Sequence, residues 1–547
     1  MTDTHSMTVG EYLIHRLGEL GIREMFGIPG DYILKFFQMV EKSPIEMVVT
    51  TNELCAGYAA DAYARINGIG AACITYAVGG FSLTNAVASA YAEMSPVVFI
   101  SGSPGLKRQK RNWHLHHMVG TPDTQFQVFE KLTVASCVID DPLTAFREID
   151  RVLSACLRYK RPVYIELPQD RLDITSPYPH NPTIETPLSD ADELREALGD
   201  ALGKLYSSRS PVVIAGIELH RHKLADEVLK FAEANNIPVV STLLSKSVIR
   251  ENHPLYVGVY QAAMGRKEVT EFVESSDCIL MLGAMITDTD TGIFTHNLDQ
   301  SRVIFATSDQ ISIGYHHYQD IVLSDFVRAL SQKSLPAYHR PLPRIVNPID
   351  APWIAEADEP MTVRRLFQKI NSILSSTTIV LADPGNALFG AADLSVHDSA
   401  EFLGSAFYAT LGWAVPAAIG VQYAAPTHRP IVLVGDGAFQ MTCCELGTTR
   451  RKGLNPIVIV LNNKGYLTEK VIFEGTFNDI PDWSYHRLPE FLGAGIGFEV
   501  RTEGELDAAL TASLANADSF SILNVHLGER DHAPGLKRLG DGLAGRS

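Results

Sequence analysis

The chain has 547 residues, of which 46% are hydrophobic and 20% are charged. This length predicts three or four domains at about 150 residues each, and the composition excludes a disordered, collagen-like or coiled-coil protein. The formal net charge of −17 argues against a general binder of nucleic acid or of anionic membranes.

Two proline-rich segments divide the sequence. Residues 176–190 contain four prolines and residues 335–360 contain six. Proline fixes φ and removes a backbone donor, so neither segment can sustain a helix or a central strand, and both are predicted as linkers. They leave three parts of ordinary domain size, which we place at residues 1–182, 190–340 and 355–547.

All three parts show short apolar runs that alternate with helical patterns. In chain order, the predicted strands cover residues 24–27, 71–75, 96–100, 211–216, 237–240, 278–283, 431–434 and 457–461, and the clearest helical patterns cover residues 9–20 and 224–232. Apolar runs of this length between helices are typical of buried parallel strands. The predicted fold class is therefore α/β, with three doubly wound parallel-sheet domains.

Composition also bears on the compartment. Residues 1–10 are polar, and the seven cysteines are scattered without a C-x-x-C pair, which favours reduced thiols in a cytoplasm. Residues 402–421 carry no charge and are long enough to cross a bilayer, but they are rich in alanine and glycine and include Pro416. We interpret them as a buried helix, and predict a cytoplasmic protein with no membrane partner.

The most informative motif lies between residues 431 and 469. One predicted strand ends in Gly435-Asp436-Gly437, a helix follows that stops near Gly453, and the next strand ends in Asn462-Asn463. A strand–helix–strand crossover makes the two strands parallel, so both polar turns emerge at the same carboxyl edge. Carboxylate and amide oxygens suit Mg²⁺ that also binds phosphate. Either turn alone is most often an ordinary loop. The two turns together, with 24 residues between Gly437 and Asn462, favour a site for a metal and a diphosphate.

This pattern resembles the cofactor motif of thiamine diphosphate enzymes, and the similarity covers nearly the whole chain. The nearest branch is the 2-oxo acid decarboxylases, which act on pyruvate, indolepyruvate or phenylpyruvate. The resemblance implies a pyrimidine-binding, a middle and a diphosphate-binding domain. It also implies thiamine diphosphate and Mg²⁺ as cofactors, with Asp436, Asn463 and the carbonyl of Gly465 as metal ligands. Leu411 matches the residue that would hold the cofactor in a bent shape. Further implied cofactor contacts are Gly385, Asn386, Ala409, Gly437 and Ala438.

The same resemblance assigns the groups that move protons. Glu53, in Thr51-Asn52-Glu53-Leu54, matches the glutamate that hydrogen-bonds the aminopyrimidine ring. Asp31, the pair His116-His117 and Glu469 match the polar cluster beside the reacting carbon, which suits proton transfer near neutral pH. A zinc site that includes His114 is the alternative for the histidines, but the sequence offers no further ligands at metal spacing.

Residues on the substrate side depart from the pyruvate-restricted pattern. Leu388 and Thr468 stand where those relatives carry Trp and Ile, and Thr75 supplies a hydroxyl. The resemblance therefore implies a pocket for larger aliphatic or aromatic acids, unless Ile472 and the C-terminal segment refill it. A second departure is Asp383-Pro-Gly-Asn386-Ala387, where the family shows Gly-Asp-Ser or Gly-Asp-Cys, so Asn386 brings no charge to the diphosphate.

The leading hypothesis is non-oxidative decarboxylation of a 2-oxo acid to an aldehyde and CO₂. A carboligase of the acetohydroxyacid synthase or benzaldehyde lyase type, or a benzoylformate decarboxylase, is the alternative within the family. A nucleotide-binding regulator built on the middle domain is the alternative outside enzymes. The resemblance further implies a homodimer or homotetramer, in which Asp31, Glu53, His116 and His117 of one chain face Asp436, Asn463 and Glu469 of another.

Overall fold

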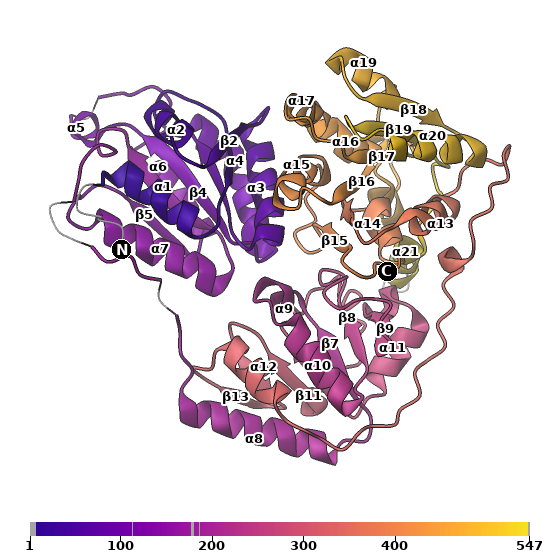
Figure 1. Ribbon diagram of the computed structural model, residues 1–547. Coiled ribbons are helices and arrows are strands. Elements are labelled where there is room, and N and C mark those ends of the chain that lie inside the picture. The colour runs from indigo at the N-terminus through magenta and orange to yellow at the C-terminus, as the bar shows by residue number, and fades with distance from the viewer. Residues whose placement is uncertain (1–6, 112, 177–179, 185, 545–547) are drawn as a thin grey trace. The chain divides into compact units, whose positions relative to one another are not determined.

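The computed structural model of the chain describes residues 7–111, 113–176, 180–184 and 186–544 (Figure 1). The chain divides into two compact units. Unit 1 comprises Met1–Thr186, Trp413–Thr427 and Thr442–Leu454, and unit 2 comprises Pro187–Gly412, His428–Met441 and Asn455–Ser547. Each unit is described by itself below.

Unit 1 is built on a six-stranded sheet in which all the paired strands are parallel, in the order β2-β1-β3-β4-β6-β5. Its strands are β1 (Glu24–Gly27), β2 (Glu46–Val49), β3 (Gly70–Ile74), β4 (Val97–Ser103), β5 (Ala135–Val138) and β6 (Val163–Pro168). Its N-terminal helices are α1 (Val9–Glu19), α2 (Leu34–Glu41), α3 (Glu53–Asn67), α4 (Val78–Ala92), α5 (Leu106–Gln109), α6 (Thr124–Leu132) and α7 (Ala145–Tyr159). The predicted strands at 24–27, 71–75 and 96–100 and the helix at 9–20 are confirmed.

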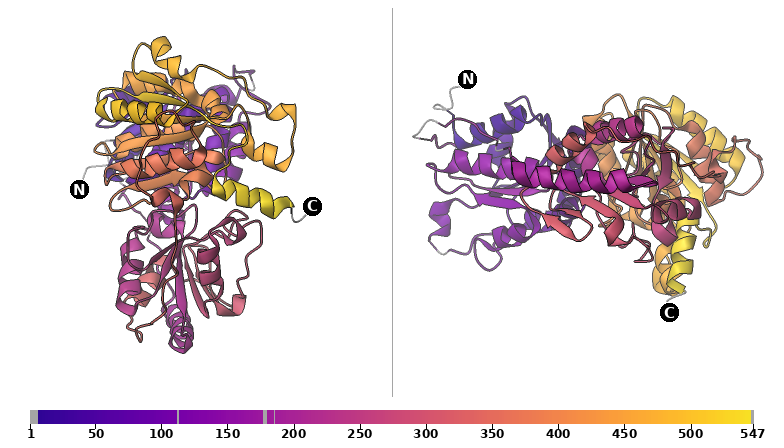
Figure 2. Two further views of the ribbon diagram at one scale, coloured as in Figure 1. Left: turned by 90° about the vertical axis from the view of Figure 1, so that its right-hand side faces the viewer. Right: turned by 90° about the horizontal axis from the view of Figure 1, so that it is seen from below.

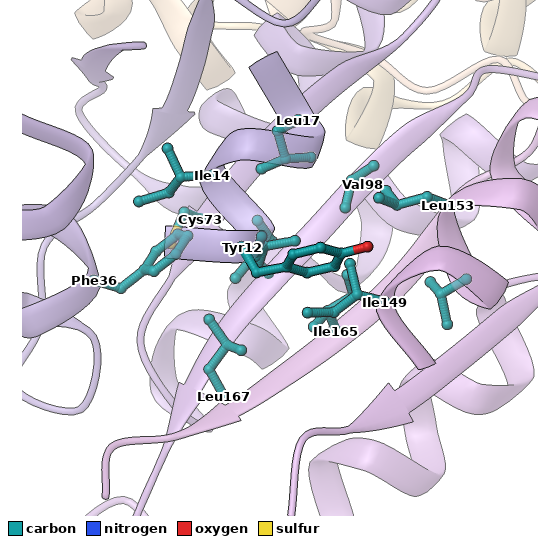
Figure 3. Packing of buried hydrophobic residues seen from close by; sticks show 14 of the residues in the cluster. Tyr12, Ile14, Leu17, Phe36, Cys73, Val98, Ile149, Leu153, Ile165 and Leu167 are labelled. Atoms are coloured by element: carbon teal, nitrogen blue, oxygen red, sulfur yellow. The ribbon is translucent and has the colours of Figure 1, made fainter. Parts of the chain in front are cut away.

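One face of this sheet is covered by α1 and α7. Figure 3 shows Tyr12 and Leu17 of α1, Ile149 and Leu153 of α7, and side chains of β3, β4 and β6 in one apolar cluster. The buried Asp150 carboxylate of α7 is fixed by hydrogen bonds: Tyr12 Oη and Arg16 Nε of α1 donate to it at 2.9 and 2.7 Å. A buried charge that is paired in this way does not oppose burial of the apolar face.

The other face of the sheet is covered by α3 and α4, and α3 in turn packs against α15 (Ala414–Ala424). The two helices approach so closely that a Cβ at Gly420 would lie 1.9 Å from the Ala59 carbonyl oxygen. Trp413, which is fully buried, donates from Nε1 to Asp61 Oδ2 at 2.7 Å. Helix α17 (Leu446–Arg451) also belongs to unit 1.

The prediction of one buried helix over residues 402–421 is partly wrong. The segment begins with strand β15 (Glu401–Gly404), continues as a loop, and becomes helical only at Ala414. Burial, rather than membrane insertion, explains its apolar composition, because Val415, Ile419 and Val421 are each at most 1% exposed. Among the described residues, every helix is too short or too polar to cross a bilayer.

Unit 2 contains a seven-stranded sheet with the order β13-β12-β11-β10-β7-β8-β9. Its strands are β7 (Pro211–Ala215), β8 (Val239–Ser241), β9 (Tyr256–Val259), β10 (Cys278–Leu282), β11 (Val303–Ala306), β12 (Ile311–Ile313) and β13 (His316–Tyr318), and its helices are α8 (Ala191–Ser207), α9 (Ile217–Arg221), α10 (Ala225–Asn235), α11 (Lys267–Glu274) and α12 (Leu323–Ser331). Helices flank this sheet on both sides in the left view of Figure 2. The pairs β11–β12 and β12–β13 are antiparallel, so this sheet is parallel except at one edge.

The second sheet of unit 2 has six strands, and all its paired strands are parallel, in the order β15-β14-β16-β17-β19-β18. Besides β15, its strands are β14 (Thr378–Ala382), β16 (Arg429–Gly435), β17 (Ile457–Asn462), β18 (Ile496–Val500) and β19 (Ser521–His526). The associated helices are α13 (Val363–Ile373), α14 (Asn386–Ala391), α16 (Asp436–Thr442), α18 (Leu467–Ile472), α19 (Leu488–Leu492), α20 (Glu503–Ala515) and α21 (Pro534–Ala544). The helix predicted between Gly437 and Gly453 is broken into α16 and α17 by a 3₁₀ turn at Cys443–Glu445.

The proline-rich segments connect these sheets as predicted. The described residues of 176–190 contain no helix or strand, and those of 335–360 contain only the short 3₁₀ turn Pro348–Asp350. Prolines 177 and 179 lie outside the described residues.

Candidate active site

The predicted site residues of unit 1 follow the carboxyl ends of β1 to β4. Asp31 follows β1, Glu53 follows β2, Thr75 follows β3, and the His116-His117 pair lies in the loop after β4. Because these strands are parallel, their carboxyl ends share one edge of the sheet, where ligands bind in open α/β sheets.

Asp31 is the centre of a carboxylate–imidazole cluster. One of its oxygens accepts a short hydrogen bond from His116 Nε2, and the other lies 3.8 Å from His117 Nε2. The His116 ring stacks on Tyr32 with 4.7 Å between ring centroids, and His117 adopts a left-handed φ of 67°. All three members of the cluster are exposed, so they can exchange protons with a ligand or with water.

The same three residues are also the group among the described residues that could hold a metal ion, since their ligand atoms lie within 4.8 Å of one another. Neither His114 nor another described His, Cys, Asp or Glu joins them. Structural zinc takes four protein ligands, so the cluster is incomplete as a zinc site of that kind.

Glu53 and Thr75 converge on the start of α4. A Cβ at Gly79 would lie 3.3 Å from Thr75 Cγ2 and 3.4 Å from Glu53 Oε1, so the glycine leaves room for both side chains. Glu53 is the first residue of α3, and the Asn52 side chain caps that helix by accepting from Cys55 N at 2.9 Å. Thr75 is 7% exposed, and its Oγ1 has no partner among the described residues, so this hydroxyl is available to a ligand.

Unit 2 carries a cavity of about 310 Å³ at the carboxyl ends of β14, β16 and β17. The cavity is bounded by both polar and apolar residues. Its lining comprises Thr289, Pro384, Gly385, Asn386, Leu388, Phe389, Ala406, Ala409, Leu411, Gly435, Asp436, Gly437, Ala438, Leu461, Asn463, Gly465, Tyr466, Leu467, Thr468, Glu469 and Leu539. The predicted juxtaposition of Asp436 with Asn463 at one sheet edge is confirmed.

Asp436 is a buried carboxylate with one free oxygen. The side chain is 2% exposed, its Oδ1 accepts from Gly437 N at 2.8 Å, and its Oδ2 has no partner among the described residues. Burial raises the pKa of Asp436 to about 6, although the backbone N–H groups around it lower that pKa. An unpaired buried carboxylate is costly unless a cation compensates it, so this atom indicates a cation site.

The loop between β15 and α15 forms another wall of the cavity. The buried Asp383 carboxylate accepts from Gly412 N at 2.8 Å and so fixes the end of this loop. Ala409 has a left-handed φ of 54°, and Leu411 presents an apolar surface beside Ala406. The strained turn is thus held by a buried carboxylate that the sequence motif Asp383-Pro-Gly places at the end of β14.

Asn386 also lines the cavity, but its amide is already engaged. Its Oδ1 accepts from Ala533 N at 2.7 Å and its Nδ2 donates to the Asp531 carbonyl at 3.0 Å. The position at which the family carries a charged residue therefore holds the segment before α21. The neighbouring Ala387 is 1% exposed and packs as an apolar residue.

Three further residues of the predicted site, Leu388, Thr468 and Glu469, line this cavity. Leu388 is 2% exposed, whereas Thr468 is half-buried and Glu469 is exposed on the first turn of α18. Ile472, on the last turn of the same helix, is 57% exposed and does not line the cavity. Within unit 2, Ile472 therefore does not line the cavity beside Leu388, whereas Leu539 of the C-terminal segment does.

Comparison with known proteins agrees with this geometry. The thiamine pyrophosphate enzyme models match three segments: the N-terminal TPP binding domain at residues 7–126, the central domain at 198–333 and the C-terminal TPP binding domain at 383–525. The chain belongs to the thiamine pyrophosphate enzymes. This membership establishes thiamine diphosphate, the same cofactor under its other name, as the group that the fold binds.

Curated relatives align over almost the full length of this thiamine pyrophosphate enzyme. An indole-3-pyruvate decarboxylase of Azospirillum brasilense is 37% identical over 525 residues, which are 94% of this chain and 95% of the relative. An alpha-keto-acid decarboxylase of Mycobacterium tuberculosis is 35% identical over 95% of this chain and 94% of the relative. An alpha-keto-acid decarboxylase of Mycobacterium avium is 34% identical over the same shares of both chains.

Two residues of the enzyme's cavity come from segments without any predicted site residue. Thr289 comes from an irregular segment after β10, and Leu539 comes from α21. Neither belongs to a motif, and both reach the cavity only because the middle sheet and the C-terminal helix pack on the diphosphate-binding sheet. Only the tertiary fold could identify them.

Proposed function

We propose that the chain is a Mg²⁺- and thiamine diphosphate-dependent decarboxylase, which converts a 2-oxo acid and a proton into an aldehyde and CO₂. The observation that carries this proposal is the free, buried Oδ2 of Asp436 in one cavity with Asn463 and Glu469. The full-length similarity to an indole-3-pyruvate decarboxylase supports the choice of reaction within the family.

Asp436, Asn463 and the Gly465 carbonyl would hold Mg²⁺, which prefers such oxygen ligands and keeps other positions for phosphate oxygens and water. The cation would compensate the buried carboxylate. Backbone groups at Gly385, Gly437 and Ala438 would approach the diphosphate, and the apolar surfaces of Ala409 and Leu411 would support the rings. Asn386 contributes indirectly, because its amide is bonded to the chain before α21.

Bound thiamine diphosphate supplies a carbon nucleophile and an electron sink for the departing carboxylate. Glu53 would hold a proton at the aminopyrimidine, with its position fixed by the Asn52 cap of α3. His116 and His117, oriented by Asp31, would deliver and remove protons at the substrate oxygen and at the carbon that loses CO₂. Glu469 would exchange protons from the opposite side, and the Thr75 hydroxyl would orient the substrate.

The acceptable substrates would be larger than pyruvate. Leu388 and Thr468 are small for their positions, and Ile472 lies outside the cavity lining, which supports a pocket for a long aliphatic or aromatic side chain. Each methylene buried there would contribute about 0.8 kcal/mol. Phenylpyruvate-like and indolepyruvate-like acids are the proposed class.

We further propose a cytoplasmic homodimer or homotetramer with domains at residues 1–182, 190–340 and 355–547. In this assembly the unit 1 residues of one chain complete the site with the unit 2 residues of another. Subunit complementation tests the arrangement. Mixing Glu53→Gln with Asp436→Ala chains should restore about a quarter of wild-type activity, since random dimers would contain one intact site in half of the molecules. A site built within one chain would give no recovery.

The reaction itself is tested by aldehyde formation with thiamine diphosphate and Mg²⁺. The substrates to compare are pyruvate, a branched-chain 2-oxo acid, phenylpyruvate, indolepyruvate and benzoylformate. Asp436→Ala should lose the Mg²⁺-dependence of cofactor binding, and unchanged binding would place the metal elsewhere. Carboligation without net aldehyde release would contradict the proposed reaction class, and no activity with any of the acids would contradict the substrate class.

A further inference from the structure

A second, polar cavity of unit 2 lies outside the candidate active site. It measures about 190 Å³ and is lined by the middle sheet's strand β9 and by residues on the side of the C-terminal sheet. Gln261 and Arg266 line it from the middle part, and Asp393, Ser395 and Arg538 line it from the C-terminal part. Arg538 lies on α21, which packs against α14 and against the 3₁₀ turn Ala262–Met264 (Figure 1).

Two ion pairs fix the walls of this cavity. Lys246 is 2% exposed, and its Nζ donates to both oxygens of Glu251 at 2.7 and 2.8 Å and to the Leu394 carbonyl at 2.6 Å. Arg266 donates to Asp393 Oδ1 from Nε and Nη2 at 3.0 and 2.8 Å. The Arg266–Asp393 pair and the bond from Lys246 to the Leu394 carbonyl join the middle part to the C-terminal part. Each ion pair neutralises its own charge, so the two give shape to the cavity without a net attraction for an ion.

Two side chains of this cavity have hydrogen-bond donors that these ion pairs do not use. Arg538 Nε donates to the Met264 carbonyl at 2.6 Å, and no hydrogen bond or ion pair of its two Nη groups is formed within the part of the chain whose side chains are described, residues 7–540 apart from 112, 177–179 and 185. Gln261 is 3% exposed, and its buried Nε2 has no acceptor among the same residues. Burial lowers the pKa of Arg538, although the charge of Asp393 opposes this shift.

A cationic donor and an amide donor that face one cavity without acceptors indicate an anionic ligand. A guanidinium binds carboxylates and phosphates through parallel hydrogen bonds, so either could satisfy Arg538. The lining also contains Glu251, Asp350 and Asp393, however, and these carboxylates disfavour a second negative charge on the ligand. The cavity volume of about 190 Å³ suits a small molecule.

We propose that this cavity binds a small organic monocarboxylate, held by the Arg538 guanidinium and the Gln261 amide. The site is separate from the substrate cavity, but the two are linked through α21, because Arg538 lines one cavity and its neighbour Leu539 lines the other. A bound carboxylate would brace α21 against the Ala262–Met264 turn. The binding itself does not depend on the proposed decarboxylase function.

The test measures binding of propanoate, which has no keto group and cannot be decarboxylated by the proposed reaction. Calorimetric titration of the full-length protein, loaded with thiamine diphosphate and Mg²⁺, should show propanoate binding that weakens at least tenfold in Arg538→Gln. Lys537→Gln removes an exposed charge one residue away and should leave the affinity unchanged. Gln261→Met removes the amide donor at nearly constant volume and should weaken propanoate binding also.

Hydrogen exchange locates the ligand. Propanoate should slow amide exchange at residues 261–266 and 392–395 in the wild type, and should not do so in Arg538→Gln. Equal propanoate affinity in wild type, Arg538→Gln and Gln261→Met would overturn the proposal, as would a higher affinity for inorganic phosphate than for propanoate. This test measures binding and not turnover, so its result can be interpreted even if the protein has no decarboxylase activity. Conversely, a failure to bind propanoate would not contradict the proposed function.

Discussion

The Asn386 side chain accepts a hydrogen bond from the backbone N–H of Ala533, with 2.7 Å between Oδ1 and N. Together with the bond from Nδ2 to the Asp531 carbonyl, this ties the first turn of α14 to the chain that leads into α21. Leu388 of α14 and Leu539 of α21 both line the candidate active site. The side chain that departs from the family pattern thus holds two walls of the cavity together.

Asn386→Ala should loosen α21 while the sheets stay intact. Two hydrogen bonds of about 1 kcal/mol each are removed, so the free energy of local opening at residues 531–540 should fall by about 2 kcal/mol. Amide hydrogen exchange at Ala533 measures this directly. Asn252→Ala, at an exposed asparagine, is the control and should leave exchange in α21 unchanged. Protected α21 amides in Asn386→Ala would show that packing alone holds the helix.

Glu53→Gln should abolish turnover without unfolding the protein. The amide keeps the shape of the side chain at the start of α3 but cannot exchange a proton with the aminopyrimidine as a carboxylate does. We expect C2–H exchange on bound thiamine diphosphate to slow by orders of magnitude, measured by NMR after acid quench. Glu41→Gln, on the exposed end of α2, controls for loss of charge. Wild-type exchange rates in Glu53→Gln would remove this residue from the proposed mechanism.

Glu166 gives unit 1 a pH-dependent stability. Burial raises its pKa from 4.5 to about 7, although Tyr164 Oη donates to Oε2 at 2.9 Å. Since the pKa of the folded state is the higher one, stability is greatest below pH 4.5 and is lost as the pH rises through about 7. The loss amounts to about 3 kcal/mol at 1.36 kcal/mol per pKa unit.

Glu166→Gln should remove this dependence. The variant should be more stable than wild type by about 3 kcal/mol at pH 8 and equally stable near pH 4, as measured by urea unfolding at both pH values. Gln125 donates to Tyr164 and accepts from the backbone N–H of Ala77, which is two residues from Thr75. Because the substitution could reach the site through these bonds, activity should be measured in parallel. A stability difference that is the same at both pH values would mean that Glu166 does not titrate in this range. Glu130→Gln is the exposed control.

The parallel sheets and the Asp436–Asn463 pair could be predicted because each rests on local pattern. Apolar runs that end in glycine give buried strands, and a crossover brings two polar turns to one edge regardless of what else packs there. The break at Cys443 and the late start of α15 at Ala414 could not be predicted in this way. Helix α15 packs on α3, and at the break Glu445 accepts hydrogen bonds from Thr51, so both features meet segments more than 340 residues earlier in the chain.

The hydrogen bonds of Asn386 could not be predicted from the sequence either. The sequence shows an amide where the family carries a charge, and nothing near it reveals that residues 531–533 return to bond it. The same holds for Thr289, which comes from the middle part of the chain. Motifs identify residues that meet the cofactor, whereas residues that shape the cavity from distant segments depend on how the sheets dock.

Substrate size should be controlled by Leu388. Its side chain is 2% exposed and lines the same cavity as Thr468. If this space receives the substrate's side chain, wild-type kcat/KM should be higher for phenylpyruvate and for a long straight-chain 2-oxo acid than for pyruvate, because each buried methylene contributes about 0.8 kcal/mol. Leu388→Trp should fill the space and shift the ranking toward pyruvate by about tenfold or more.

Leu514→Trp, at a residue 45% exposed on α20, adds the same bulk away from the cavity and should leave the ranking unchanged. Pyruvate as the best substrate of the wild type, or an unaltered ranking in Leu388→Trp, would contradict this account of specificity.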